Sequence, residues 1–299
     1  MRVSTFSIVA YDRRNGDLGV AVQSKFVAVG AVVPWAKAKV GAVATQASAN
    51  VSYGPRALDM LEDGLNSSQV VERLLSEDEE SQVRQVAVVD SKGNVAVHTG
   101  AGCMQWAGHV TGEGYSCQGN ILAGKAVVDS MAQAYELAKG DLIDRLLAAL
   151  TAGQRAGGDR RGQQSAALLV VREKGGYEGF TDRYVDLRVD DSPRPIEELR
   201  RIFKIYDMTM LSREDPANLI PVTGPVARSI QRYLKALRFY RGSITGIYDE
   251  LTEKALQDFV NVNNFENRMR EDQLIWKSIL KYMQDSAMRV KRNRSPRKP

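Results

Sequence analysis

The sequence has few of the residues on which several large classes of protein depend. Its 299 residues include only two cysteines and two histidines, too few cysteines for a disulfide framework, as is usual in a reducing compartment. No stretch reaches the roughly 18 apolar residues of a membrane-spanning helix. The first residues also lack the apolar core of a secretion signal. We therefore expect a cytoplasmic protein with no membrane span.

Motifs for bound cofactors, metals and catalytic triads are absent as well. No glycine pattern of the dinucleotide or P-loop type follows a predicted strand, and no Gly-x-Ser-x-Gly elbow is present. The residues Cys103, His109 and Cys117 do not have the spacing of a common zinc site, and a fourth ligand is missing. We expect no cofactor and no metal, and we expect both cysteines to be packing residues.

Basic residues exceed acidic residues only toward the C-terminus. The whole chain has 41 Lys and Arg and 36 Asp and Glu, a net charge of +5. Residues 1–220 have 25 basic and 28 acidic residues, whereas residues 286–299 have six basic residues and no acidic one. We therefore expect no nucleic-acid binding by the main domain. Residues 286–299 are interpreted as a basic disordered tail.

Apolar patterns divide the chain into two domains. Strands are expected at 5–11, 18–24, 86–89, 95–99, 166–171 and 185–189, with a type I′ hairpin turn at Asn15-Gly16. Helices are expected at 55–63, 67–75, 125–139, 142–154, 196–206, 226–237, 252–262 and 273–283. Hairpins outnumber βαβ units, which favours two layers of antiparallel sheet with helices outside them. The predicted domains cover 1–206 and 226–285, with a linker at 207–225.

Small hydroxyl and amide side chains on glycine-rich backbone are the remaining candidates for chemistry. Thr5 and Ser7 share one face of the first strand, and residues 45–50 end another strand with four polar groups. Residues 118–120 form a polar turn, and the polar loop 157–164 precedes a core strand. Taken singly, each is explained at least as well by ordinary turn or cap hydrogen bonding.

Taken together, these segments occur in the order in which a known bacterial family has them. The matching segments are 5–10, 19–26, 29–36, 41–47, 53–55, 118–120, 157–162 and 185–191. Over roughly residues 4–206 the chain resembles the family called domain of unknown function 1028. That family is assigned to the N-terminal-nucleophile (Ntn) hydrolase fold. The resemblance therefore implies an α+β fold, a four-layer αββα sandwich, to which a small C-terminal all-α domain is added. It implies the activity only by analogy, because the family's substrate is not established.

The Ntn resemblance also implies a set of site residues. In that chemistry a Thr, Ser or Cys at the start of the first strand attacks an amide carbonyl. Its own free α-amine, with a pKa near 8, acts as the general base, so no histidine is needed. By this logic Thr5 is the nucleophile and Lys25 lowers its pKa. The residues Asn50, Asn120 and Asp159 are then expected to orient the reacting groups, with an Asn side chain and backbone N–H groups stabilising the oxyanion.

The start of the chain departs from the pattern of the family. The resemblance suggests a beginning Met-Thr-Phe-Ser, whereas Arg2, Val3 and Ser4 precede Thr5 here. Methionine is normally removed only before a small residue, so a free Thr5 amine needs cleavage after Ser4. Three possibilities stay open: the protein processes itself, Met1 is not the true start, or Thr5 is not a nucleophile of this type. Ser7 is a weaker substitute, because its nitrogen belongs to a peptide bond and cannot act as the base.

The C-terminal segment has a resemblance of its own. The segments 225–234, 240–249 and 252–259 combine an apolar-Gln-x-x-Leu helix, a Gly-x-Ile-x-Gly-x-Tyr turn and a Thr-x-x-Ala-Leu-x-x-Phe helix. This combination resembles a peptidoglycan-binding helical domain, which implies a peptidoglycan fragment as a partner. The alternative is a helical bundle that only packs or mediates contacts between subunits.

Three functions follow from the two resemblances, and whether the chain is an enzyme is left open. The first is an Ntn-type hydrolase that cleaves an amide bond in a small acylated amino compound. The second is a non-catalytic protein of the same fold that binds a small ligand. The third is a cell-wall-associated protein targeted by its C-terminal domain. We also expect a homodimer, because the small-residue sheets and the added domain both offer surfaces.

Overall fold

The computed structural model describes residues 5–211 and 213–294, and side chains as far as residue 290. Contacts between residues divide the chain into two compact units, Met1–Phe203 and Lys204–Pro299. We call them unit 1 and unit 2, and each is described by itself. No helix in the described part of the chain is long and apolar enough to cross a bilayer.

A six-stranded antiparallel sheet is the larger sheet of unit 1. Its strands, in spatial order, are β10 (Arg183–Val189), β9 (Ser165–Val171), β2 (Asp17–Ser24), β1 (Thr5–Asp12), β8 (Tyr115–Asn120) and β7 (Gly108–Gly112). Strand β1 lies in the interior of this sheet and pairs with β2 on one side and β8 on the other. The start of β1 is therefore enclosed by backbone on both sides.

A second antiparallel sheet faces the first. Its strands, in spatial order, are β3 (Pro34–Lys37), β4 (Gly41–Ala47), β5 (Arg84–Asp90) and β6 (Val95–Thr99). The space between the sheets is filled largely by small and branched apolar side chains. Val9 and Val22 come from the six-stranded sheet, and Ala42, Ala44 and Ala87 come from the four-stranded one. The short alanine side chains allow the two sheets to pack closely.

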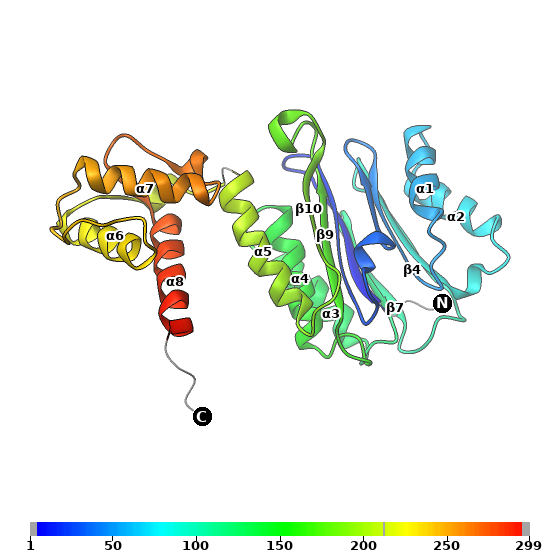
Figure 1. Cartoon of the computed structure of the whole chain (residues 1–299). Coiled ribbons are helices and arrows are strands. Elements are labelled where there is room, and N and C mark those ends of the chain that lie inside the picture. Colours follow the sequence, from blue (N-terminus) through cyan, green and yellow to red (C-terminus); the bar gives the residue numbers. More distant parts are fainter. Residues whose placement is uncertain (1–4, 212, 295–299) are drawn as a thin grey trace, which may run out of the picture. The chain divides into compact units, whose positions relative to one another are not determined.

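Helices cover the outer faces of both sheets, as Figure 1 shows. The pair α3 (Ala126–Leu137) and α4 (Leu142–Arg155) lies on the six-stranded sheet. The pair α1 (Tyr53–Glu62) and α2 (Ser67–Ser76) lies on the four-stranded sheet. The expected mixture of helices with antiparallel sheets is thus confirmed.

Side chains of β1 alternate between these two environments, as the sequence pattern predicts. Phe6 points to the helix layer, where a side chain added at Gly153 of α4 would meet its ring. Ser7 points the other way and contacts the four-stranded sheet through Gln46. Because alternate residues share a face, Thr5 lies on the same side as Ser7, toward the space between the sheets.

The first hairpin differs in detail from the prediction. Asp12 pairs with Asp17, so the β1–β2 connection has the four residues 13–16 rather than a two-residue type I′ turn. Gly16 adopts a left-handed φ of 78°. The carboxylate of Asp12 accepts a hydrogen bond of 3.1 Å from the backbone N–H of Arg14, and such local bonds stabilise the longer loop.

Unit 2 is mainly helical. It contains α6 (Gly224–Ala236), α7 (Glu250–Val262), α8 (Lys277–Arg294) and a small sheet of β11 (Leu219–Pro221) and β12 (Leu274–Trp276). The helix α5 (Pro195–Met210) continues from unit 1 into it. Its core includes Ile230, Leu234, Phe259, Phe265 and Met283.

The regions expected as linker and tail contain regular structure. Within 207–225, α5 continues to Met210 and β11 pairs with β12, because Met208 and Ile220 pack on the core of unit 2. Helix α8 continues to Arg294, where a disordered tail from residue 286 was expected. The helix is extended by burial of Ala287, which is 3% exposed. The rest of the predicted tail, residues 295–299, lies outside the described residues.

A substitution at Gly54 tests how closely α1 packs against the four-stranded sheet. A Cβ atom at Gly54 would overlap the indole ring of Trp35. We expect Gly54→Ala to lower the free energy of unfolding by about 1–3 kcal/mol, the usual cost of overpacking. Gly124 has no atom within 4 Å of the corresponding position, so Gly124→Ala should change stability by less than about 0.5 kcal/mol. Urea titrations of both variants measure this, and equal stabilities would contradict it.

Candidate functional site

Polar side chains gather at the end of the six-stranded sheet where β1 begins. Thr5 is fully buried, and its Oγ donates a hydrogen bond of 3.2 Å to the Oγ of Ser24 on β2. On its other side Thr5 pairs with Asn120, the last residue of β8. Residues paired across neighbouring strands place their side chains on the same face. The hydroxyl of Thr5 thus lies between a second hydroxyl and a carboxamide.

A chain of buried carboxamides connects this end of the sheet to the four-stranded sheet. The Nε2 of Gln118 donates to the Oγ of Ser7 (2.7 Å), and that Oγ donates to the Oε1 of Gln46 (2.7 Å). The Nε2 of Gln46 donates to the Oε1 of Gln85 (2.8 Å), which also accepts from the Nδ2 of Asn120 (3.1 Å). All five side chains are at most 2% exposed. A fully bonded network of this kind rigidifies its surroundings, because an unpaired buried polar group is costly.

Gln85, on β5, is the centre of this network and determines its direction. Its Nε2 donates to the carbonyl oxygens of Gly108 (3.2 Å) and Gly119 (2.9 Å) and to the Oγ1 of Thr99 (2.9 Å). The two carbonyls can only accept, so the NH2 group of Gln85 must face them and its Oε1 must face Asn120. The carboxamide of Asn120 is therefore held in one orientation beside Thr5.

A histidine adjoins the far side of the same network. The Nδ1 of His109 lies 2.9 Å from the Oγ1 of Thr99. Burial lowers the pKa of His109 below its ordinary value, because a charged imidazolium loses hydration there. A neutral His109 fits a structural role at the edge of the network. None of the hydrogen bonds described above joins His109 to Thr5.

The glycine-rich loop 157–164 crosses the sheet end above Thr5. Its residue Arg160 donates a backbone hydrogen bond of 3.0 Å to the carbonyl of Ile121, just after β8. Its residue Asp159 accepts one of 2.9 Å from the backbone N–H of Lys25, just after β2. Since β1 lies between β2 and β8, the loop spans the strand that begins with Thr5.

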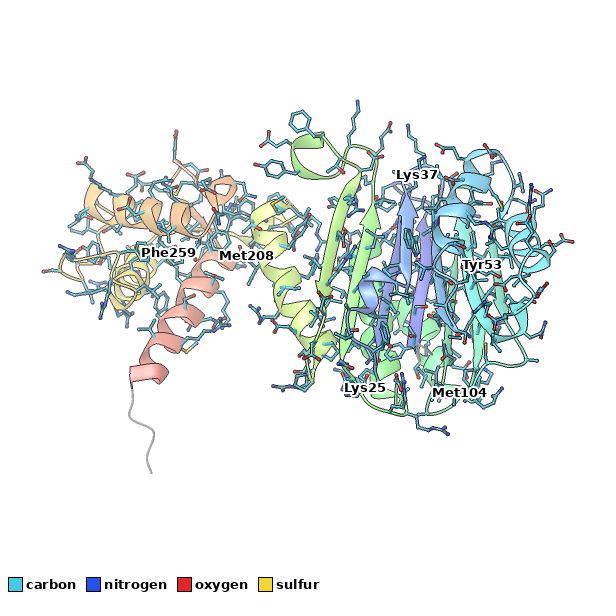
Figure 2. All side chains as sticks on the ribbon, turned by 45° about the vertical axis from the view of Figure 1, so that its right-hand side comes forward. Lys25, Lys37, Tyr53, Met104, Met208 and Phe259 are labelled. Atoms are coloured by element: carbon cyan, nitrogen blue, oxygen red, sulfur yellow. The ribbon has the colours of Figure 1, made fainter. Side chains whose placement is uncertain are left out.

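A narrow pocket opens at this end, between the two sheets. Its lining includes Ala47, Ser48, Val83, Met104, Asn120 and Ile121. The carbonyl of Met104 accepts a hydrogen bond of 2.9 Å from the N–H of Ile121, which fixes the pocket wall. Figure 2 labels Met104 and Lys25 at the same end of the sheets. The pocket is small, with a volume of about 10 Å³, and Ser48, Asn120 and the thiol of Cys103 are the polar groups in its lining. It therefore holds only a water-sized group, and a larger ligand would lie across its mouth.

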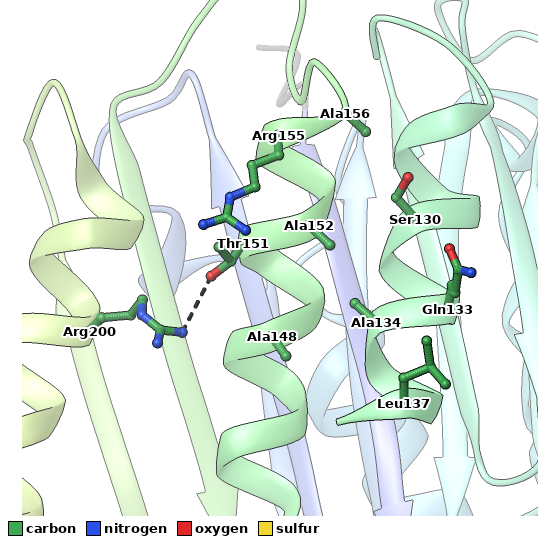
Figure 3. Close-up of a pocket in the computed structure, with 10 residues that line it drawn as sticks. All are labelled: Ser130, Gln133, Ala134, Leu137, Ala148, Thr151, Ala152, Arg155, Ala156 and Arg200. Carbon is green, nitrogen blue, oxygen red and sulfur yellow. Dashed lines mark hydrogen bonds between the residues drawn. The ribbon is translucent and has the colours of Figure 1, made fainter. Parts of the chain in front are cut away.

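A wider depression lies on the opposite side of the six-stranded sheet (Figure 3). It is formed by α3, α4 and α5, with the alanines Ala134, Ala148 and Ala152 at its floor. At its rim a guanidinium nitrogen of Arg200 donates to the Oγ1 of Thr151 (3.4 Å). The sheet separates this depression from Thr5, so we do not include it in the candidate site.

The predicted site residues do not all come together. Thr5, Ser7, Asn120 and Asp159 lie at one sheet end, as expected. Lys25 follows Ser24 there, but its ammonium group is exposed and lies 3.3 Å from the carbonyl of Gln163. It has no hydrogen bond to Thr5 among the described contacts. Its predicted role of lowering the pKa of Thr5 therefore has no support from geometry.

Asn50 belongs to a separate cluster beside the pocket. Its Nδ2 donates to the Oδ2 of Asp78 (3.2 Å), which also accepts from the hydroxyl of Tyr53 (2.7 Å). The guanidinium of Arg84 pairs with the same carboxylate (2.9 Å) and donates to the carbonyl of Ser48 (2.7 Å). Ser48 lines the pocket, so this cluster positions one pocket wall, and Asn50 contacts the pocket only through the cluster.

The pKa values of Asp78 and Tyr53 determine which groups of this cluster are charged. The hydrogen bond from Arg84 holds the pKa of Asp78 well below its ordinary value. Burial, together with the neighbouring Asp78 carboxylate, raises the pKa of Tyr53. Around neutral pH, Asp78 is therefore ionised and Tyr53 keeps its proton. Sequence reasoning missed Asp78, Arg84 and Gln85, since they come together only through long-range pairing of strands and loops.

Fold and site together define unit 1 as a mixed α/β domain with a buried polar network and a small pocket between two antiparallel sheets. Residues 5–199 match the model described as Family of unknown function (DUF1028). Protein SPO2555 from Silicibacter pomeroyi, a DUF1028 protein of known crystal structure, is 31% identical, over 68% of this chain and 89% of that one, with a TM-score of 0.62. The chain belongs to the DUF1028 family, which confirms the resemblance.

Three other comparisons concern unit 2, a solved structure of low similarity, and the curated proteins. Residues 209–283 match the model described as "Putative peptidoglycan binding domain". Anbu (ancestral beta-subunit) from Yersinia bercovieri is 11% identical, over 66% of this chain and 92% of that one, with a TM-score of 0.30. That TM-score is too low to carry an argument. The search of curated proteins finds no match.

The Asp78–Arg84 pair predicts how stability depends on pH. A carboxylate whose pKa is lowered by folding stabilises the fold above its ordinary pKa of 3.8 and loses that contribution as the pH falls below it. We expect Asp78→Asn to lower the free energy of unfolding at pH 7 by about 2 kcal/mol. The difference from the wild type should shrink as the pH is lowered from about 5 toward 2. Chemical denaturation at several pH values measures it.

Glu197→Gln is the matched control. The pair Arg194–Glu197 is 73% and 69% exposed, and exposed pairs contribute little. This variant should match the wild type at every pH. A pH-independent loss in Asp78→Asn would show that the ion pair does not stabilise the fold in the way described.

Proposed function

We propose that unit 1 is an Ntn-type hydrolase that cleaves an amide bond in a small acylated amino compound, with Thr5 as the nucleophile. The observation that carries this proposal is the position of Thr5. It begins an interior strand, its hydroxyl faces the space between the sheets, and Asn120 lies opposite it. A pocket lined by Asn120 opens at the same end.

The order of layers in unit 1 supports the same proposal. A helix pair, a sheet, a second sheet and a second helix pair follow one another, which is the αββα order expected for an Ntn-like sandwich. Membership of the DUF1028 family specifies no activity. The proposal therefore rests on the geometry around Thr5.

The reaction uses two groups of the protein, the hydroxyl and the free α-amine of an N-terminal Thr5, together with one water molecule. The free α-amine takes the hydroxyl proton while Oγ bonds to the acyl carbon of the amide. The tetrahedral intermediate collapses, the amine proton passes to the leaving nitrogen, and an acyl ester of Thr5 remains. Water, deprotonated by the same amine, then hydrolyses the ester to a carboxylic acid and restores the hydroxyl. The sum is one amide plus one water giving one acid and one amine.

Other residues of the site have supporting roles in this proposal. Asn120, held by Gln85, orients the acyl group beside Thr5. Asp159 anchors the crossing loop to the backbone of Lys25. Ser7 is bonded to both Gln46 and Gln118, so it is a network residue rather than a second nucleophile.

A free amine on Thr5 requires removal of residues 1–4, which lie outside the described residues. In the described structure the side chain of Thr5 is fully buried. We infer that cleavage between Ser4 and Thr5 precedes catalysis. The alternative, a non-catalytic protein that binds a small ligand in the same pocket, needs no such cleavage.

Intact-mass and N-terminal analysis of the purified protein, combined with Thr5 variants, separates these two functions. We expect active protein to begin at Thr5, and we expect Thr5→Ala to lose at least about 10³-fold in kcat/KM on short N-acyl amino acids. Thr5→Ser, which keeps a hydroxyl, is the control and should retain measurable activity. An active Thr5→Ala variant would overturn the assignment. Binding without turnover by a chain that begins at Thr5 would favour the ligand-binding alternative.

We also propose that unit 2 binds peptidoglycan. The match over 209–283 supports this, and so does a rigid turn with exposed apolar side chains. Gln231 is buried, accepts from the N–H of Gly246 (2.9 Å) and donates to the carbonyl of Ile247 (2.9 Å). The side chains of Ile244, Ile247 and Leu251, on and beside this turn, are 42%, 66% and 54% exposed. Apolar groups held at a surface in this way mark interaction sites.

Cosedimentation of the full chain with purified sacculi tests the wall-binding proposal. We expect the protein to pellet, and we expect Ile247→Asp to reduce the pelleted fraction severalfold. Val262→Asp is the control, since Val262 is 70% exposed but lies at the end of α7, outside the turn. Protein that stays in the supernatant would contradict the proposal. A cytoplasmic location and a homodimer stay predictions, the second testable by light scattering.

A further inference from the structure

We propose that the substrate is an N-acyl amino acid with a free carboxylate, which Lys25 and Arg160 bind at the mouth of the pocket. This inference rests on the proposed function, because it names the substrate class of the same site. It is carried by the distribution of charged and apolar groups around Thr5.

Cationic side chains exceed acidic ones on the loop that crosses β1. Arg160 and Arg161 follow Asp159 in this loop, and the Asp159 carboxylate accepts from the backbone N–H of Lys25. A second carboxylate, that of Asp191, accepts a hydrogen bond of 3.1 Å from the Nε2 of Gln164 at the end of the loop. Asp159 is buried and pairs with the guanidinium of Arg161 at 3.1 Å. That pair is neutral as a whole, so the two positive charges of Lys25 and Arg160 stand against the one negative charge of Asp191.

These two cations are available to a ligand. Both side chains are exposed. The ammonium of Lys25 contacts a neutral carbonyl, that of Gln163, and no ion pair among the described residues involves it. The guanidinium of Arg160 has neither a hydrogen bond nor an ion pair within the described part of the chain. Most other arginines of unit 1 are paired, as those at positions 84 and 172 are.

Backbone contacts place the two residues that carry these charges next to the pocket lining and to Thr5. Arg160 is hydrogen-bonded through its N–H to Ile121, which lines the pocket. Lys25 directly follows Ser24, whose hydroxyl contacts Thr5. A ligand group that reached both cations would therefore lie beside the pocket mouth.

The opposite side of the mouth is apolar. Val83, Met104 and Ile121 line the pocket, and the side chain of Met104 is 44% exposed. The cavity itself is too small for an acyl chain, so we place the chain along this apolar wall at the pocket mouth and the carboxylate on the cationic side. A molecule with an acyl chain at one end, a carboxylate at the other and an amide between them matches this arrangement.

Binding to the full-length Thr5→Ala variant tests the substrate class without turnover. The probes are N-butyryl-L-alanine and its uncharged analogue N-butyryl-L-alaninamide, and titration calorimetry at low salt measures their Kd. We expect the acid to bind about tenfold more tightly than the amide. We expect the double substitution K25Q/R160Q to remove that difference while leaving the Kd of the amide unchanged.

R155Q is the matched control, because Arg155 is an exposed arginine of α4 on the helix side of the six-stranded sheet. It should leave both Kd values unchanged. Equal binding of acid and amide, no binding of the acid, or an equal effect of R155Q would each overturn the inference.

The failure of this inference and the failure of the proposed function give different results. A chain beginning at Thr5 that cleaves the uncharged amide as fast as the acid would retain the hydrolase and refute the carboxylate site. Binding of the acid that depends on Lys25 and Arg160, without cleavage by that chain, would retain the carboxylate site and refute the hydrolase.

Discussion

The carboxamide of Gln85 is the interaction on which the geometry of the site depends. From β5 it donates to two backbone carbonyls of the other sheet, at Gly108 and Gly119, and accepts from Asn120. These bonds join β5 of the four-stranded sheet to β7 and β8 of the six-stranded sheet at a single buried point. Because the carbonyls fix which end of the carboxamide faces them, the direction of every hydrogen bond from Ser7 to Asn120 follows. The site is thus positioned by the packing of the sheets and not by a flexible loop.

The side chains between the two sheets change from apolar to polar along the strands. Toward one end it is filled by apolar side chains such as Val9, Val20 and Ala87. Toward the end where β1 begins, hydroxyls and carboxamides replace them, and these satisfy one another. Burying so many polar groups stabilises the fold little, since each exchanges water for a protein partner. Their value is a fixed orientation, which is what a nucleophile at Thr5 and an orienting Asn120 need.

Sequence patterns predicted most helices, six strands of the two sheets and the family, but not the strands β7 and β8, the bounds of β3 and β4, or the connections within the site. Alternation in β1 correctly separated Phe6 from Ser7, and the chain order of segments identified the DUF1028 family. The partners of Gln85 could not be predicted, because they lie 14 to 39 residues away and no local period links them. The helix beyond residue 286 was missed for a related reason: among the described side chains 286–290 the buried one, Ala287, is small, and the sequence that follows it is rich in basic residues.

The central claim is that Thr5 becomes the N-terminal nucleophile. An electrophilic β-lactone that acylates hydroxyl nucleophiles tests it most directly, with the protein digested and the modified peptide sequenced by mass spectrometry. We expect one acyl group on a peptide that begins at Thr5. We also expect none on Thr5→Ala protein. An acyl group on Ser7 or Cys103, or on a peptide that still contains Ser4, would contradict the account.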